Sequence, residues 1–186
     1  MLASLGKPER HVAAIGFAGP IASGKSTVIE SLSSIRPCHI VSYGDYVRAV
    51  ATRRGIEGSR DALQALSNEL LGEYGHSGLA ELVIRSRHWD QKVPLIIDGV
   101  RHVEAIEAIR KILEPIPAHL VFIKTPNNVR MERIKLRDST DIKTARQQDL
   151  HDTELEVSEQ LRYLADAVVD GRKPELSATQ INELFL

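Results

Sequence analysis

Cysteine is nearly absent from this chain of 186 residues, since Cys38 is the only one. A single cysteine excludes an internal disulfide and suits the reducing cytoplasm. Cys38 lies beside an apolar run, which favours a packed side chain over a nucleophile. No apolar run approaches the ~18 residues of a membrane-spanning helix, and residues 1–10 lack the apolar core of a signal peptide. We therefore expect a cytoplasmic protein with no membrane partner.

Aromatic residues are also scarce, at 4% of the sequence, and the formal net charge is only -1. Few rings argue against a protein that stacks on many bases, and a charge near zero supplies no overall field for nucleic acid. Nucleic acid is therefore a possible partner but not a favoured one. The remaining composition, 42% hydrophobic and 26% charged, is that of an ordinary globular protein, and the length fits one domain over residues 1–186.

A glycine-rich segment over residues 19–27 reads G-P-I-A-S-G-K-S-T, which matches the phosphate-binding pattern G-x-x-x-x-G-K-[ST]. Residues 12–18 before it predict a buried strand, and residues 26–32 after it have helical spacing. Glycines let backbone N–H groups turn toward phosphate oxygens, and the helix adds its positive end. Lys25 supplies a charge for the β- and γ-phosphates, and the Ser26 hydroxyl supplies a ligand for Mg²⁺. A chance match in a glycine turn is the alternative, which the flanking strand and helix disfavour.

Five short apolar stretches, rich in Val, Ile and Leu, predict β-strands separated by helical patterns. This alternation predicts an α/β protein with the three-layer fold of phosphate-loop NTPases, in which helices flank a five-stranded parallel sheet. Ligands bind such sheets at the carboxyl ends of the strands, so the informative residues should follow each strand. The expected strands are residues 12–18, 39–42, 93–97, 119–124 and 167–169.

The segment Ser-Tyr-Gly-Asp-Tyr-Val-Arg at residues 42–48 resembles the nucleoside monophosphate kinases, adenylate kinase in particular, which carry Thr-Gly-Asp-x-x-Arg at this place. The resemblance implies an acceptor site that includes Tyr43 and Gly44, with Arg48 on the acceptor phosphate and Asp45 near the metal and the reacting phosphates. From the residues alone, Asp45 and Arg48 lie i, i+3 on a starting helix, where a cap and a surface ion pair are the alternative. If the acceptor is a hydroxyl, Asp45 is the first candidate for the base.

Residues 43–92 have helical spacing and no convincing strand, and these kinases carry a helical substrate-binding insertion at this place. Helices are expected over residues 60–71 and 79–88. The glycine-containing segment 75–78 between them is a candidate hinge or an ordinary helix end. Trp89 offers a stacking surface for a base, although a partly buried packing role is more typical of tryptophan.

The third expected strand leads into Asp98-Gly99-Val100-Arg101. A carboxylate after an apolar strand, in a chain with a phosphate-binding loop, is typical of the aspartate that holds Mg²⁺. Adenylate kinases have Asp-Gly-x-x-Arg here, which implies an acceptor role for Arg101, one position closer in this chain. That spacing is more similar to kinases of the dephospho-CoA kinase type. Ser26 and Asp98 are thus the expected metal ligands.

The fourth expected strand is followed by Thr125-Pro126, which predicts a helix with threonine as its N-cap and proline at its first position. Arg130, Arg133 and Arg137 then recur along one face of that helix. The resemblance implies that they cover the triphosphate and the adenine. A solvated helix face with local ion pairs is the alternative.

Two further segments complete the resemblance. Residues 137–150 are expected to form a short lid without zinc, with Arg146 as a clamp on the acceptor, before a helix over residues 153–164. Asp-Gly-Arg-Lys-Pro at residues 170–174 resembles the Asp-Gly-Thr-Lys-Pro segment that passes the adenine edge in adenylate kinases, which places Lys173 in the ATP site. A solvent turn is the alternative there, and Ser177 is expected to cap a closing helix.

These motifs together predict an ATP-dependent phosphotransferase of the nucleotide kinase type, with Mg²⁺ as cofactor and ATP and a nucleotide-like small molecule as partners. The alternatives are a kinase that acts on nucleic acid and a regulatory ATPase without a small-molecule acceptor. We expect a core over residues 11–42, 93–136 and 165–186, an insertion over 43–92 and a lid over 137–150. The expected catalytic residues are Lys25, Asp45, Asp98 and Arg133. The expected ATP-binding residues are Gly19, Ala22, Ser23, Gly24, Lys25, Ser26, Thr27, Arg130, Arg133, Arg137 and Lys173.

Overall fold

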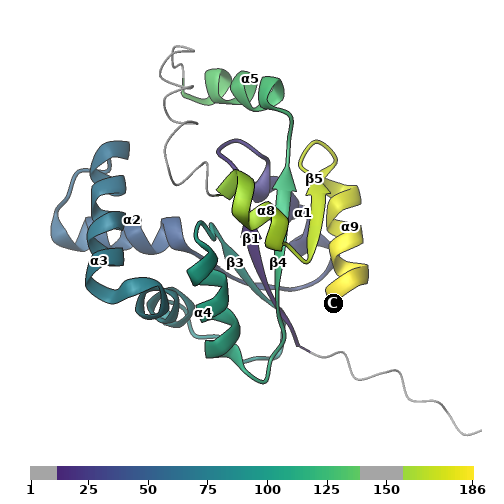
Figure 1. The fold of residues 1–186 in the computed structure, drawn as a ribbon, viewed down its shortest axis with the longest axis horizontal. Coiled ribbons are helices and arrows are strands. Elements are labelled where there is room, and N and C mark those ends of the chain that lie inside the picture. The colour runs from purple at the N-terminus through teal and green to yellow at the C-terminus, as the bar shows by residue number, and fades with distance from the viewer. Residues whose placement is uncertain (1–11, 139–156) are drawn as a thin grey trace, which may run out of the picture.

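A computed structural model describes residues 12–138 and 157–186 of the chain. Five parallel strands form a sheet in the order β2-β3-β1-β4-β5, which confirms the predicted sheet (Figure 1). Since β1 is central, the segment that follows it lies between the carboxyl ends of β3 and β4. The strands are β1 Ala14–Ala18, β2 His39–Ser42, β3 Leu95–Asp98, β4 Ala118–Lys124 and β5 Ala167–Asp170.

Helices cover both faces of this sheet, which confirms the three-layer arrangement. One face packs against α1 (Lys25–Ile35) and α9 (Pro174–Phe185), and it presents Ile15 and Phe17 of β1. The other face packs against α2 (Tyr43–Arg54), α3 (Arg60–Arg85) and α4 (Val103–Leu113), and it presents Ala14 and Ala18 of β1. This alternation follows from the period of two in a β-strand.

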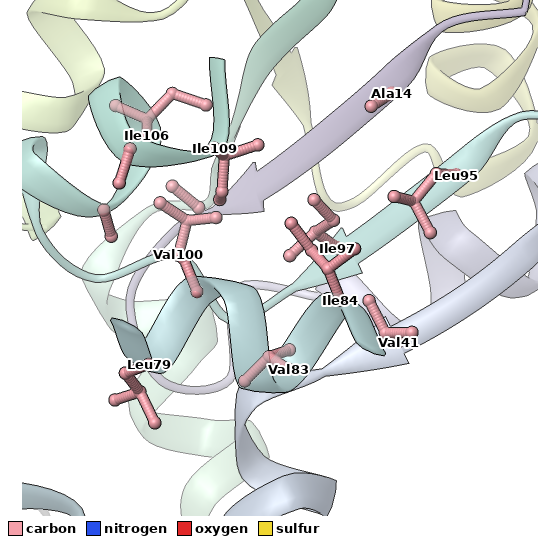
Figure 2. Packing of buried hydrophobic residues seen from close by; sticks show 14 of the residues in the cluster. Ala14, Val41, Leu79, Val83, Ile84, Leu95, Ile97, Val100, Ile106 and Ile109 are labelled. Carbon is pink, nitrogen blue, oxygen red and sulfur yellow. The ribbon is translucent and has the colours of Figure 1, made fainter. Parts of the chain in front are cut away.

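Apolar packing on the second face holds the insertion to the sheet. Figure 2 shows Val83 and Ile84 of α3 close to Val41 of β2 and Ile97 of β3, with Ile109 of α4 nearby. Each fully buried side chain of this size contributes about 1.5–3 kcal/mol of hydrophobic free energy. The helices between β2 and β3 therefore share one core with the strands instead of forming a separate unit.

Helix α3 contains a sharp bend at Gly75, where the backbone has φ 64° and ψ 177°. No atom outside its chain neighbours lies within 4 Å of the place that a Cβ would take, so the backbone conformation, and not space, favours glycine here. The break expected at residues 75–78 is thus confirmed at its first residue. The second half of the helix ends at Arg85 and does not reach residue 88.

Two expected helix caps are wrong. Helix α5 (Asn127–Asp138) follows Pro126, and the Thr125 hydroxyl instead donates a 2.8 Å hydrogen bond to the carbonyl of Ser23. Helix α9 begins three residues before Ser177, whose hydroxyl donates to the carbonyl of Asp170 at 2.9 Å. Both hydroxyls therefore hold neighbouring loops together at the end of the sheet, which a local capping pattern does not reveal.

Helical segments η1 (Val157–Leu161) and α8 (Arg162–Leu164) precede β5. Outside the described residues lie residues 139–150 of the expected lid over 137–150, with Arg146 among them, and the start of the expected helix at 153. Residues 1–11 and the side chain of Arg137 are also outside them. Within the described ranges, no helix combines the length and the apolar character that crossing a membrane requires.

Trp89 lies between the insertion and the sheet. Its indole Nε1 donates a 2.8 Å hydrogen bond to the carbonyl of Val93, just before β3, and its ring packs against the core shared by α3 and α4. The packing role expected from the sequence is therefore confirmed.

Candidate active site

The segment between β1 and α1 curls through several left-handed backbone conformations. Gly19, Ala22 and Gly24 have φ values of 148°, 58° and 95°. A Cβ at Gly19 would lie 2.7 Å from the carbonyl oxygen of Ile123, so this glycine is also required by close packing. The N-cap residue of α1 is Gly24, which has no side chain to cap the helix start. Such a loop and helix start form an anion-binding concavity.

Lys25, the first residue of α1, folds back over this loop. Its Nζ donates to the carbonyls of Gly19 at 2.6 Å and Pro20 at 3.2 Å. The ammonium group is therefore held at the concave side of the loop by neutral acceptors. Ser26 and Thr27 follow in the first turn of α1 and are exposed, so their hydroxyls are accessible beside the ammonium.

Asp98 ends β3 and pairs in register with Phe17 of β1, two residues before Gly19. Its Oδ1 is buried and has no hydrogen-bond partner. Burial raises the pKa of Asp98 above its ordinary value, and the positive charges of Lys25 and Arg101 oppose that rise. A buried carboxylate oxygen without a partner needs a cation or a donor. Carboxylate and hydroxyl oxygens are the hard ligands that Mg²⁺ prefers, so Asp98 and Ser26 fit the expected metal by their chemistry.

The first turn of α2 lies at the carboxyl end of β2, next to β3. The Arg48 guanidinium donates to Asp45 Oδ1 at 2.6 Å, and both side chains are more than half exposed. A Cβ at Gly44 would lie 3.3 Å from the Arg48 guanidinium. The Tyr43 hydroxyl is buried without a hydrogen-bond partner, and burial raises its pKa.

Asp45 and Arg48 act electrostatically on the Asp98 carboxyl, as Lys25 and Arg101 do. Charged groups that follow three strands, β1, β2 and β3, therefore act on one carboxyl. The surface ion pair of Asp45 and Arg48, the alternative interpretation of this segment, is also present.

Two arginines of α5 reach back to the phosphate-binding loop. Arg130 is 6% exposed, and its Nη1 donates to the carbonyl of Ile21 at 3.1 Å. Arg133 donates through Nη1 to the carbonyl of Ala22 at 3.2 Å and through Nη2 to the carbonyl of Gly171 at 3.1 Å. Sequence reasoning placed these residues on the correct helix face but missed their contacts with loop carbonyls.

The turn between β5 and α9 packs directly on the phosphate-binding loop. A Cβ at Gly171 would collide with the carbonyl oxygen of Ser23 and lie 2.6 Å from the Thr125 hydroxyl. Lys173 is the N-cap residue of α9, so it belongs to this turn. The Ser23 hydroxyl is itself buried with no hydrogen-bond partner. No pattern in the sequence pointed to this packing of backbone on backbone.

A cavity of about 270 Å³ opens beside the same turn, between the ends of β4 and β5. Asp170 at its edge is held by Arg172 through a 2.6 Å ion pair, and this contact lowers the pKa of Asp170 to about 2. The cavity offers both apolar surface and charge to a ligand at the place where the adenine edge was expected. It is lined by Lys124, Pro126, Val168, Val169, Asp170 and Arg172.

Comparisons with known proteins agree with this geometry. The model of a family described as an AAA domain matches residues 15–160. A UPF0200 protein of Thermococcus gammatolerans is 33% identical over 121 residues, which span 64% of this chain and 63% of that relative. A UPF0200 protein of Hyperthermus butylicus is 32% identical over 144 residues, 75% of each chain.

Solved structures share the fold over most of their length. The protein TT1252 from Thermus thermophilus has a TM-score of 0.60 at 20% identity and covers 94% of this chain and 98% of its own. Shikimate kinase from Acinetobacter baumannii has a TM-score of 0.57 at 16% identity, with 94% and 93% covered. A gluconokinase from Sinorhizobium meliloti has a TM-score of 0.55 at 17% identity, with 94% and 96% covered. The fold is therefore that of the phosphate-loop kinases.

Proposed function

The chain belongs to the AAA domain family and to the UPF0200 proteins, and within that membership we propose that it is an ATP-dependent kinase for a nucleotide-like small molecule. ATP·Mg²⁺ binds the loop over residues 19–27, and its γ-phosphoryl group passes to an acceptor held between α2 and the loop after β3. Such a transfer depends on positioning and charge neutralisation more than on covalent chemistry.

The observation that carries this proposal is the buried Asp98 oxygen without a hydrogen-bond partner, at a carboxyl that feels several positive charges. Lys25 belongs to the helix after the phosphate-binding loop, whereas Arg48 and Arg101 follow β2 and β3. A phosphoryl group in transfer carries negative charge on both the donor and the acceptor side, and this arrangement offers cations to both.

Each residue of the site has a role in the proposed reaction. Lys25 leaves the loop carbonyls to contact the β- and γ-phosphates. Ser26 and Asp98 would hold the metal, which would supply neutralisation of phosphate charge. Arg133 keeps the phosphate-binding loop in shape and lies close enough to Gly24 to reach a phosphate there. The other loop residues contact ATP through their backbone N–H groups, and Arg130 and Lys173 lie beside the loop. These loop residues are Gly19, Ala22, Ser23, Gly24 and Thr27.

The acceptor in this proposal is an anion. The guanidinium groups of Arg48 and Arg101 favour a phosphate or a carboxylate, which they can hold through paired hydrogen bonds. A phosphate acceptor needs no strong base. A hydroxyl acceptor does, and Asp45 would then accept its proton after release from Arg48.

ADP release from ATP, measured against a panel of acceptors, tests the proposal. The panel contains nucleoside monophosphates, dephospho-CoA, shikimate, gluconate and oligonucleotides, because two structural neighbours carry the names of shikimate kinase and gluconokinase. Stimulation by a nucleotide-like molecule, lost in Lys25→Met, is the expected result. Wild-type turnover by a folded Lys25→Met protein would rule out the mechanism.

Other outcomes separate the alternatives. Stimulation by oligonucleotides alone, falling steeply with salt, would indicate a kinase for nucleic acid. Steady ADP release that no acceptor changes would indicate a regulatory ATPase.

A further inference from the structure

Two histidines and a glutamate meet between the bend of α3 and the start of α4. His76 directly follows the bend of α3 at Gly75, His102 is the N-cap residue of α4, and Glu104 lies in the first turn of α4. One ligand atom from each of the three side chains lies within 4.8 Å of the others. The two rings stand edge to face, with centroids 4.8 Å apart.

Ordinary contacts leave one ring nitrogen of His76 without a partner. His76 Nδ1 is buried and has no hydrogen-bond partner. His76 Nε2 lies 3.9 Å from Glu104 Oε2, which is too long for a hydrogen bond. Because a buried polar atom without a partner costs free energy, a partner is expected. The donors that surround this ring are another imidazole and a carboxylate, and these are metal ligands.

We propose that His76, His102 and Glu104 bind a divalent transition-metal ion of the Zn²⁺ type. Two imidazole nitrogens and one carboxylate oxygen form a ligand set that Zn²⁺ accepts and Mg²⁺ disfavours. With bonds of about 2.0–2.2 Å, tetrahedral ligands lie about 3.4 Å apart, so the three donors must move inward by about 1 Å. The Glu104 side chain is 60% exposed and is free to rotate toward the imidazoles. The fourth position stays open to water.

This metal site is separate from the Mg²⁺ site proposed above, which uses only oxygen ligands. It joins two parts of the molecule, because α3 belongs to the insertion and His102 directly follows Arg101. Binding of the ion therefore fixes the bend of α3 against the loop that carries Arg101. The predicted consequence is a more rigid insertion beside the acceptor.

Metal binding to the full chain, stripped with a chelator and free of nucleotide, tests the proposal. Calorimetric titration with ZnCl₂ should give one site that excess Mg²⁺ does not block. Co²⁺ should bind the same site with the strong visible absorption of four-coordinate cobalt. The affinity should fall by more than about tenfold in His76→Ala and in Glu104→Gln, since even the loss of outer-shell partners costs about 10–100-fold.

His88→Ala is the matched control, because His88 is exposed and lies just beyond the end of α3. It should bind Zn²⁺ as the wild type does. Glu104→Gln changes only an exposed side chain, so it stays informative if His76→Ala fails to fold. Zn²⁺ should raise the melting temperature of the wild type and of His88→Ala by more than that of Glu104→Gln.

Absence of a single zinc site, or equal affinity in the wild type and in both ligand variants, would overturn the proposal. A six-coordinate Co²⁺ spectrum that the substitutions leave unchanged would do the same, because it would indicate scattered surface histidines. None of these measurements depends on phosphoryl transfer, so their failure leaves the proposed kinase activity untouched.

Discussion

The guanidinium of Arg133 donates a hydrogen bond through Nη2 to the carbonyl of Gly171 at 3.1 Å. Through Nη1 it donates another to the carbonyl of Ala22. The side chain thus ties the turn after β5 to the phosphate-binding loop without any nucleotide. On the sequence alone, like charges at Arg130, Arg133 and Arg137 along one helix face should repel one another. The structure shows instead that the charge of Arg133 is already shared with neutral carbonyls.

Replacement of Arg133 by alanine should therefore destabilise the nucleotide-free protein by about 1–3 kcal/mol, since hydrogen bonds from charged groups carry about this much. Relief of repulsion between like charges would by itself leave the stability of the variant unchanged or slightly higher. ATP should also bind more weakly, so ATP should raise the melting temperature of the variant less. Thermal unfolding with and without ATP measures both effects.

The control for that variant is Lys135→Ala, an exposed cation on the same helix, which should change stability by less than about 0.5 kcal/mol. If Arg133→Ala is as stable as this control, the two carbonyl contacts contribute nothing to the fold.

Gly171→Ala should disrupt the active site through sterics alone. Its Cβ would collide with the Ser23 carbonyl, and overpacking against backbone costs about 1–3 kcal/mol or more. The opposite effect is expected for Gly72→Ala inside α3, where no atom lies within 4 Å of the new Cβ and alanine favours the helix by about 0.5–1 kcal/mol. Urea unfolding of both variants checks the difference in sign.

Asp98→Asn should lower the maximal rate of transfer by about tenfold to a hundredfold and raise the Mg²⁺ concentration needed for half of that rate. Burial raises the pKa of Asp98, so the folded protein disfavours the charged form, and the charge opposes folding at neutral pH. The metal-free variant should thus be at least as stable as the wild type. Lower stability with unchanged Mg²⁺ dependence would make Asp98 a structural residue.

Arg48→Ala should raise the KM for the acceptor far more than the KM for ATP. Its partner Asp45 is exposed, and exposed ion pairs contribute about 0–1 kcal/mol, so the fold should hardly change. Arg53→Ala, another exposed arginine of α2, provides the comparison and should leave both KM values unchanged. Equal effects of Arg48→Ala on both substrates would place this side chain outside the acceptor site.

Acidity should weaken the turn between β5 and α9. Hydrogen bonds from Arg172 lower the pKa of Asp170 from 3.8 to about 2 in the folded protein. Folding therefore favours the charged form, and the stabilisation is complete above about pH 4 and is lost as the pH falls toward 2. The effect should be small, because the pair is exposed and screened by solvent. The free energy of unfolding of the wild type minus that of Asp170→Asn, measured across this pH range, should isolate the contribution of the ion pair.

The sheet could be predicted from the sequence because its strands are short apolar runs, and β1 and β3 are buried almost throughout. The runs at residues 39–42 and 167–169 fall on β2 and β5 almost without shift. A continuous apolar run indicates a buried strand, and strands of a parallel sheet covered by helices are buried. The bend of α3 could also be predicted, because the sequence has glycine at residue 75. The structure shows why: the backbone there has a positive φ.

The contacts between loops could not be predicted, since they join residues far apart in the chain. The hydroxyl of Thr125 looked like a helix cap, yet its acceptor is Ser23, 102 positions away. A local pattern describes neighbours within one turn, and these bonds form only after the strands have aligned. The pairing of His76 with Glu104 escaped sequence reasoning for the same reason.

Trp89, bonded to the carbonyl of Val93, is the only tryptophan in the sequence. Ultraviolet light that selects tryptophan therefore excites a single site, at the joint between the insertion and β3. Its emission reports whether that joint is dry or wet, because indole emission shifts to longer wavelength in water. Movement of the insertion during turnover, or its loosening before the sheet melts, can thus be followed in real time in the unlabelled wild-type protein.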